Sequence, residues 1–122
     1  MDTNRLTGKH VMITGAARGM GAAIAEHYAA QGAKICVADV NLAGCQEVVA
    51  RIKASGGQAI AAKVDVTKRD QVKAAVEATA EAFGSINIML NNAGVNTPLM
   101  FLDITEENWH QIMDINALGT LI

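Results

Sequence analysis

The sequence predicts an α/β fold in which helices cover both faces of a doubly wound parallel sheet. Three observations lead to this prediction. Short apolar runs alternate with segments of helical periodicity along the 122 residues. A glycine-rich turn follows the first apolar run. Hydrophobic residues make up 51% of the chain and aromatic residues only 3%, which is typical of small aliphatic helices packed on a sheet.

The first strand is expected at residues 9–14, where successive apolar side chains indicate burial on both faces. In the helix that follows, residues 22–31, alanines recur at helical spacing and allow close packing on the sheet. Gly32 is well placed to end this helix. A second apolar strand is expected at residues 34–39, and a helix with one apolar stripe at residues 42–55.

The third strand is expected at residues 58–66, before the most regular helical pattern of the chain, residues 68–83. A fourth strand follows at residues 86–90, and Thr105 can cap a last helix. Right-handed crossovers arrange four such strands in the order 3-2-1-4, which leaves the apolar fourth strand at an edge. Because such an edge invites pairing, we expect the 122 residues to be the first part of a larger domain; the alternative is a protein of this length whose edge another chain covers.

Charge and composition exclude several classes of partner and location. The formal net charge is −2 without a basic cluster, so neither nucleic acid nor an anionic membrane is an expected partner. No apolar run approaches the roughly 20 residues that cross a bilayer, and we expect a cytoplasmic protein. Cys36 and Cys45 lie in apolar patterns and are expected as buried thiols, not as a disulfide. The three histidines match no metal-ligand spacing, so no metal site is predicted.

The glycine-rich turn, residues 14–21, has the sequence Thr-Gly-Ala-Ala-Arg-Gly-Met-Gly and connects the first strand to the first helix. Unpaired N–H groups and the partial positive charge of a helix N-terminus attract phosphate. A glycine can adopt the strained turn, and missing Cβ atoms at Gly19 and Gly21 would let a pyrophosphate reach the backbone. The alternative is a turn that only permits close helix–sheet packing. The candidate cofactor residues here are Gly15, Arg18, Gly19, Met20 and Gly21.

Asp39 ends the second strand, where a carboxylate can accept hydrogen bonds from the adenosine ribose, and Val40 follows it in the candidate site. A 2′-phosphate would meet a like charge there, which favours NAD over NADP. Arg18 opposes this prediction, because a basic residue in the turn could hold that phosphate. The alternative for Asp39 is a solvated carboxylate at the end of a strand.

The spacing Thr-Gly-x-x-x-Gly-x-Gly resembles the classical short-chain dehydrogenase/reductase family, and residues 91–94, Asn-Asn-Ala-Gly, resemble a second motif of that family. The resemblance covers the whole chain. It implies a Rossmann-type fold containing about four strands of the family's larger sheet. Residues 1–122 would be the N-terminal NAD-binding portion of a single Rossmann domain, truncated inside the helix that carries Asn116.

The resemblance adds residues to the candidate cofactor site: Asp65, Val66, Asn92, Ala93 and Gly94. Asp65 and Val66 match the residues that hold adenine in the family, although Asp65 could instead cap the helix that starts near Thr67. Asn116 matches the catalytic asparagine, which holds a water and the catalytic lysine. Asn116 shares one stripe of the last expected helix with Trp109, Ile112 and Met113. In most proteins a polar residue on such a stripe serves helix packing.

The chain departs from the family at its general acid/base, a tyrosine in Tyr-x-x-x-Lys preceded by a serine. Tyr28 is the sole tyrosine, and Gly32 stands where the lysine would be. The resemblance therefore implies that the intact protein is an NAD(H)-dependent oxidoreductase, a homo-oligomer that interconverts an alcohol and a ketone, and that these 122 residues alone are inactive. The alternative is a non-catalytic NAD-binding or regulatory module that works by association.

Overall fold

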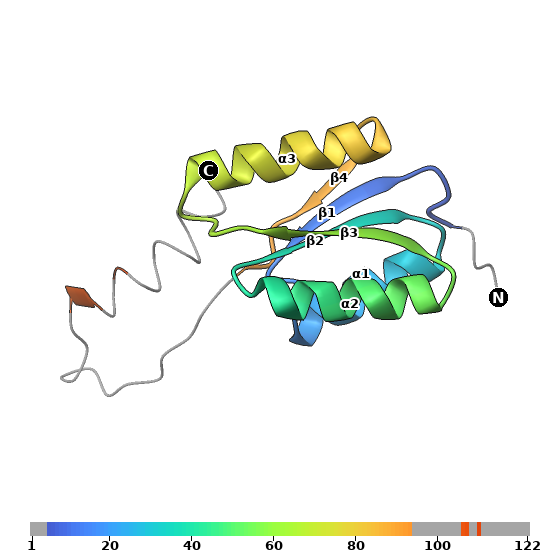
Figure 1. Ribbon diagram of the computed structural model, residues 1–122, viewed down its shortest axis with the longest axis horizontal. Coiled ribbons are helices and arrows are strands. Elements are labelled where there is room, and N and C mark those ends of the chain that lie inside the picture. The colour runs from blue at the N-terminus through green and yellow to red at the C-terminus, as the bar shows by residue number, and fades with distance from the viewer. Residues whose placement is uncertain (1–4, 94–105, 108–109, 111–122) are drawn as a thin grey trace.

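The computed structural model describes residues 5–93, 106–107 and 110 of the chain. Strands and helices alternate in it as expected (Figure 1). Their bounds are β1 His10–Thr14, α1 Gly19–Ala30, β2 Lys34–Asp39, α2 Leu42–Ala54, β3 Gln58–Lys63, α3 Arg69–Phe83 and β4 Ile88–Leu90. None of the described helices is long and apolar enough to cross a membrane.

The four strands form one parallel sheet in the order β3-β2-β1-β4, which confirms the predicted topology. β1 pairs with β2 along its full length, from His10 to Thr14. On its other side, β1 pairs with the shorter β4 from Val11 to Ile13. All carboxyl ends of parallel strands lie at one edge of a sheet, so the segments that follow the four strands are brought together.

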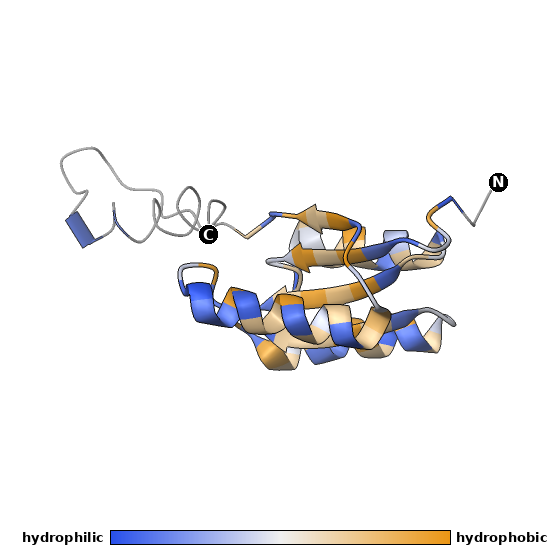
Figure 2. Ribbon diagram, turned by 90° about the horizontal axis from the view of Figure 1, so that it is seen from above, coloured by the Kyte–Doolittle hydropathy of each residue, from blue (hydrophilic) through white to orange (hydrophobic). Residues whose placement is uncertain are grey.

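Helices cover both faces of the sheet, with α1 and α2 on one face and α3 on the other (Figure 1). Successive side chains of a strand point to opposite faces. Val11 and Ile13 accordingly belong to the core cluster under α1 and α2, and Met12 belongs to the cluster under α3. All three are fully buried. In Figure 2 the strands are largely apolar, and the hydrophilic residues gather on the helices.

Several predicted bounds need correction. α1 begins at Gly19 instead of residue 22, because the amide of Ala22 already donates to the carbonyl oxygen of Arg18. β3 ends at Lys63 instead of residue 66, because β2, its only strand neighbour in the described sheet, ends at Asp39.

Two smaller corrections shorten α2, which ends at Ala54, and β4, which starts at Ile88. Of the expected last helix, residues 106, 107 and 110 have helical backbone, while Thr105 lies outside the described residues.

Candidate functional site

A cavity of about 320 Å³ opens at the carboxyl edge of the sheet. Its lining comes from the end of β2 and the segments that follow the four strands: Gly15, Arg18, Gly19, Asp39, Val40, Val64, Asp65, Val66, Asn92 and Ala93. Every lining residue except Val64 is a predicted cofactor residue. Met20 and Gly21 lie outside this lining, and Gly94 and Asn116 lie outside the described residues.

Two glycines of the turn have different surroundings. Gly15 has a φ of +64°, and a Cβ atom built on it would lie 2.8 Å from the Cα atom of Ala93. Only glycine therefore lets the loop after β4 pack against the turn. Gly19 has a φ of +61°, and a Cβ atom there would meet nothing within 4 Å. Gly19 thus leaves open space beside the backbone at the start of α1.

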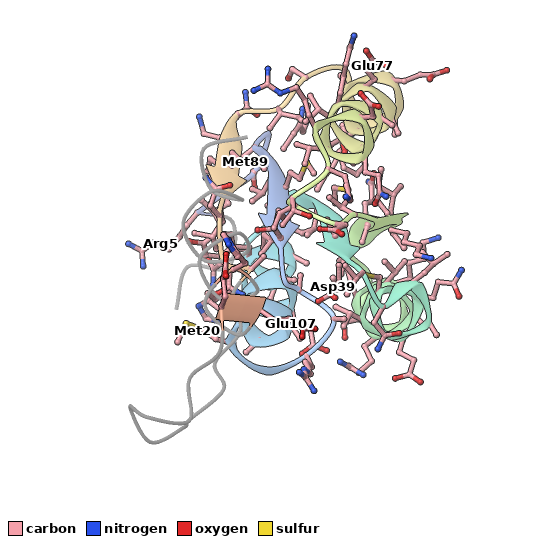
Figure 3. All side chains as sticks on the ribbon, turned by 90° about the vertical axis from the view of Figure 1, so that its left-hand side faces the viewer. Arg5, Met20, Asp39, Glu77, Met89 and Glu107 are labelled. Atoms are coloured by element: carbon pink, nitrogen blue, oxygen red, sulfur yellow. The ribbon has the colours of Figure 1, made fainter. Side chains whose placement is uncertain are left out.

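The space beside Gly21 is filled by neighbouring protein atoms. Gly21 is buried, and a Cβ atom on it would lie 2.4 Å from the carbonyl oxygen of Gly15 and 2.6 Å from Nδ2 of Asn92. Its missing side chain makes room for the turn and for the loop after β4, and its place in the coenzyme site stays a prediction. Met20 is 73% exposed, and Figure 3 shows it on the side of α1 away from Asp39.

The hydroxyl group of Thr14 joins the turn to the loop after β4. Its oxygen accepts hydrogen bonds from the amides of Asn92 (3.0 Å) and Ala93 (3.1 Å). In return, Nδ2 of Asn92 donates to the carbonyl oxygen of Gly15 at 3.2 Å. The prediction did not count Thr14 among the site residues, although its place at the end of a buried strand, directly before a glycine, was a usable signal.

Asp39 stands at the carboxyl end of β2, between α1 and α2 in Figure 3. Its Oδ2 accepts a hydrogen bond from the amide of Ala17 and its Oδ1 accepts one from the amide of Asn41, both at 3.1 Å. A carboxylate oxygen can accept more than one hydrogen bond, so Asp39 retains acceptor capacity toward the cavity. Arg18, on the same cavity, is exposed.

Asp65 is turned partly toward its own loop. Its Oδ1 accepts hydrogen bonds from the amide of Thr67 at 2.9 Å and from the hydroxyl group of Thr67 at 2.6 Å. The hydroxyl contact, mainly, lowers the pKa of Asp65. The N-cap residue of α3 is Lys68, so Asp65 orders the turn before the helix without capping the helix itself. Val64, which the prediction missed, is buried beside Asp65 at the end of β3.

The arrangement suits a nucleotide better than it suits a metal ion. It combines a glycine turn at a helix N-terminus with a carboxylate at the end of the next strand, which are the features of a dinucleotide site. Among the described residues, no group of three or more histidine, cysteine, aspartate or glutamate side chains could hold a metal ion. Tyr28 packs against the core cluster under α1 and α2 and is not part of the cavity lining.

Comparisons with known proteins agree with this geometry. The family model described as short chain dehydrogenase matches residues 9–122. The chain is 37% identical to D-threitol dehydrogenase of Mycolicibacterium smegmatis, over 97% of this chain and 45% of that protein. It is 42% identical to galactitol 2-dehydrogenase of Agrobacterium fabrum, over 96% of this chain and 44% of that protein.

A solved structure has the same fold. The crystal structure of a short-chain type dehydrogenase/reductase from Mycobacterium marinum matches with a TM-score of 0.93 and 35% identity, over 98% of this chain and 49% of that one. The chain therefore spans about half the length of the relatives it matches. With the family model matched over nearly its whole length, the chain belongs to the short-chain dehydrogenase/reductase family.

Proposed function

We propose that the cavity binds NAD(H). The diphosphate lies at the N-terminus of α1 beside Gly15 and Gly19, and Asp39 accepts hydrogen bonds from the adenosine ribose. The observation that carries this proposal is that one cavity is lined by the glycine turn, by Asp39 and by residues 65–66 and 92–93. Membership of a family of dehydrogenases and reductases supports the same ligand class.

Preference for NAD over NADP follows from the position of Asp39. Two unit charges of the same sign 4 Å apart repel by about 1–4 kcal/mol, depending on the local dielectric, so a 2′-phosphate is disfavoured there. Two backbone amides hold the carboxylate in place, and it cannot turn away without losing them. Arg18, by contrast, is an exposed side chain that would have to be ordered to grip a phosphate.

The test is calorimetric titration of the purified chain with NAD and with NADP. We expect NAD to bind about tenfold more tightly or better, in line with the lower part of that repulsion. The Arg18→Ala substitution should weaken the binding of NADP more than the binding of NAD. Tighter binding of NADP by the unmodified chain would refute the assignment.

The whole protein is proposed to be an NAD(H)-dependent oxidoreductase that interconverts an alcohol and a ketone. The nicotinamide supplies the hydride chemistry, and the residues around the cavity bind and orient the coenzyme. Polyols are the first substrates to assay, because relatives of this chain are named as threitol, galactitol and sorbitol dehydrogenases. A relative from Thermotoga maritima is named as a 3-oxoacyl-[acyl-carrier-protein] reductase, so oxoacyl thioesters are the second class.

Turnover is proposed to need the serine and the Tyr-x-x-x-Lys residues implied by the family resemblance. Asn116 is proposed as the one catalytic residue within the chain. We expect the 122 residues alone to bind coenzyme and to form no NADH from polyols, as followed by absorbance. In-frame coding sequence that continues to Tyr-x-x-x-Lys would support the enzyme, and a stop codon after Ile122 would favour a binding module. A cytoplasmic location and homo-oligomeric assembly stay predictions, and sedimentation velocity tests the second.

A further inference from the structure

We infer that Asp39 is a positioning residue for the glycine turn in addition to a ligand of the ribose. The inference rests on the proposed function, because the turn is the part of the site that receives the diphosphate. Its basis is the hydrogen bond from the amide of Ala17 to Oδ2 of Asp39, at 3.1 Å. Ala17 lies inside the turn, between the two glycines that have positive φ. The carboxylate therefore holds the backbone of the turn directly.

Both central residues of the turn are tied to the end of β2. The amide of Ala16 donates to the carbonyl oxygen of Ala38 at 3.1 Å, which extends the backbone pairing of β1 with β2. The next amide, that of Ala17, donates to the Asp39 side chain. The side chain of Asp39 thus adds a second hydrogen bond between the end of β2 and the turn.

The carboxylate itself is fixed from its other side. Its Oδ1 accepts from the amide of Asn41 at 3.1 Å, and the side chain of Asn41 caps α2 by accepting from the amide of Gly44 at 3.0 Å. A Cβ atom on Gly44 would lie 2.9 Å from the Cβ atom of Ala17, so the start of α2 also packs against the turn. Movement of Asp39 would therefore disturb the turn and the cap of α2 together.

Removal of the Asp39 carboxylate should change the affinity for a diphosphate in opposite directions through positioning and through direct electrostatics, and this makes the inference testable. A carboxylate near a diphosphate repels it, so removal of that charge would by itself strengthen the binding of an anion. Loss of the hydrogen bond to Ala17 would instead loosen the turn and weaken the binding, because ordering the turn then costs entropy on binding. A ligand that lacks the ribose hydroxyl groups isolates these two effects from ribose recognition.

The experiment measures the affinity of ADP and of 2′,3′-dideoxy-ADP for the unmodified chain and for Asp39→Ala and Asp39→Asn. Dideoxy-ADP is expected to bind about three- to tenfold more weakly to Asp39→Ala, because the repulsion that is removed with the charge offsets part of the value of a hydrogen bond to a charged group. Asp39→Asn should show a smaller loss, because an amide offers one acceptor oxygen for two N–H donors. The matched control is Asp70→Ala, an exposed aspartate outside the cavity lining, which is expected to leave the affinity within about twofold.

Unchanged or tighter binding of dideoxy-ADP to both Asp39 variants would overturn the inference and leave the proposed function standing. The ligand-free protein gives an independent reading through hydrogen exchange of the Ala17 amide, followed by NMR. Loss of protection in Asp39→Ala supports the inference, and unchanged protection overturns it. If the unmodified chain bound neither nucleotide, the proposed function would fail, while the exchange measurement would still decide whether Asp39 holds the turn.

Discussion

Substitution of Gly21 by alanine tests the close packing of α1 against the glycine turn, which lines the cavity. A Cβ atom at this position would lie 2.4 Å from the carbonyl oxygen of Gly15 and 2.9 Å from the Cα atom of Ala16. Both are backbone atoms, and ordinary van der Waals contacts begin near 3.4 Å. Because no side chain can rotate away, the turn or the helix has to shift, and overpacking of this kind costs about 3 kcal/mol.

Alanine also has a higher helix propensity than glycine, which returns up to about 1 kcal/mol. The net expectation is a loss of about 2 kcal/mol in the free energy of unfolding, or about 8 °C in the melting temperature for a chain of this size. Urea denaturation followed by circular dichroism measures the first quantity, and a thermal scan measures the second.

Gly44→Ala is the matched control, because Gly44 occupies the same position in α2, three residues after the N-cap, that Gly21 occupies in α1. Its Cβ atom would meet the Asn41 amide nitrogen at 2.8 Å and the Ala17 Cβ atom at 2.9 Å, both in side chains. The expected loss is about 1 kcal/mol, from partial disturbance of the Asn41 cap. A Gly21→Ala variant as stable as the unmodified chain, or less affected than Gly44→Ala, would refute the packing described for the turn.

Three further predictions concern stability. Thr14→Val is expected to lower the free energy of unfolding, measured by urea denaturation, by about 2–3 kcal/mol, because two amides of the loop after β4 lose their acceptor. Thr14→Ser should retain most of the stability, and equal losses in the two variants would contradict this. Burial, reinforced by the charge of Asp39, raises the pKa of Cys45 to about 12, so its thiol should react with Ellman's reagent at pH 8 only after unfolding. Because the unfolded thiol ionises first, stability should also fall as the pH rises above 9.0, and less so in Cys45→Ala. The Thr67 hydroxyl lowers the pKa of Asp65, so the stability contributed by the ionised carboxylate is present above the ordinary pKa of 3.8 and is lost as the pH falls. In Thr67→Val the free energy of unfolding should depend less steeply on pH in this acid range, and an unchanged dependence would contradict the assignment.

Much of the fold could be predicted because it depends on local patterns. Apolar runs and helical periodicity are properties of neighbouring residues, and the carboxyl ends of parallel strands share an edge whatever lies between them. The gathering of the glycine turn, Asp39, and residues 65–66 and 92–93 around one cavity followed from that rule. Both cysteines are free and fully buried, as their apolar neighbours in the sequence predict.

Three features that the sequence did not reveal depend on contacts between segments far apart in the sequence. Spacing within the turn could not reveal that Gly21 faces Asn92 and the Gly15 carbonyl instead of open space. The end of β3 depends on where β2 ends. After Lys63 one hydrogen bond to β2 follows, from the amide of Val64 to the carbonyl oxygen of Asp39. The role of Thr14 likewise depends on a loop more than 70 residues away, which no local pattern specifies.

β4 is three residues long and, in the described sheet, is attached along β1 alone. Strands of this kind detach at a lower free energy than the centre of a sheet. Detachment would carry Asn92 and Ala93 away from the Thr14 hydroxyl and take one wall of the cavity with them. A coenzyme that contacts this wall binds the closed form alone, and at 100 times its dissociation constant it would make opening harder by about 2.7 kcal/mol. The rate of proteolytic cleavage near residue 90 should then fall as the fraction of protein with bound coenzyme rises.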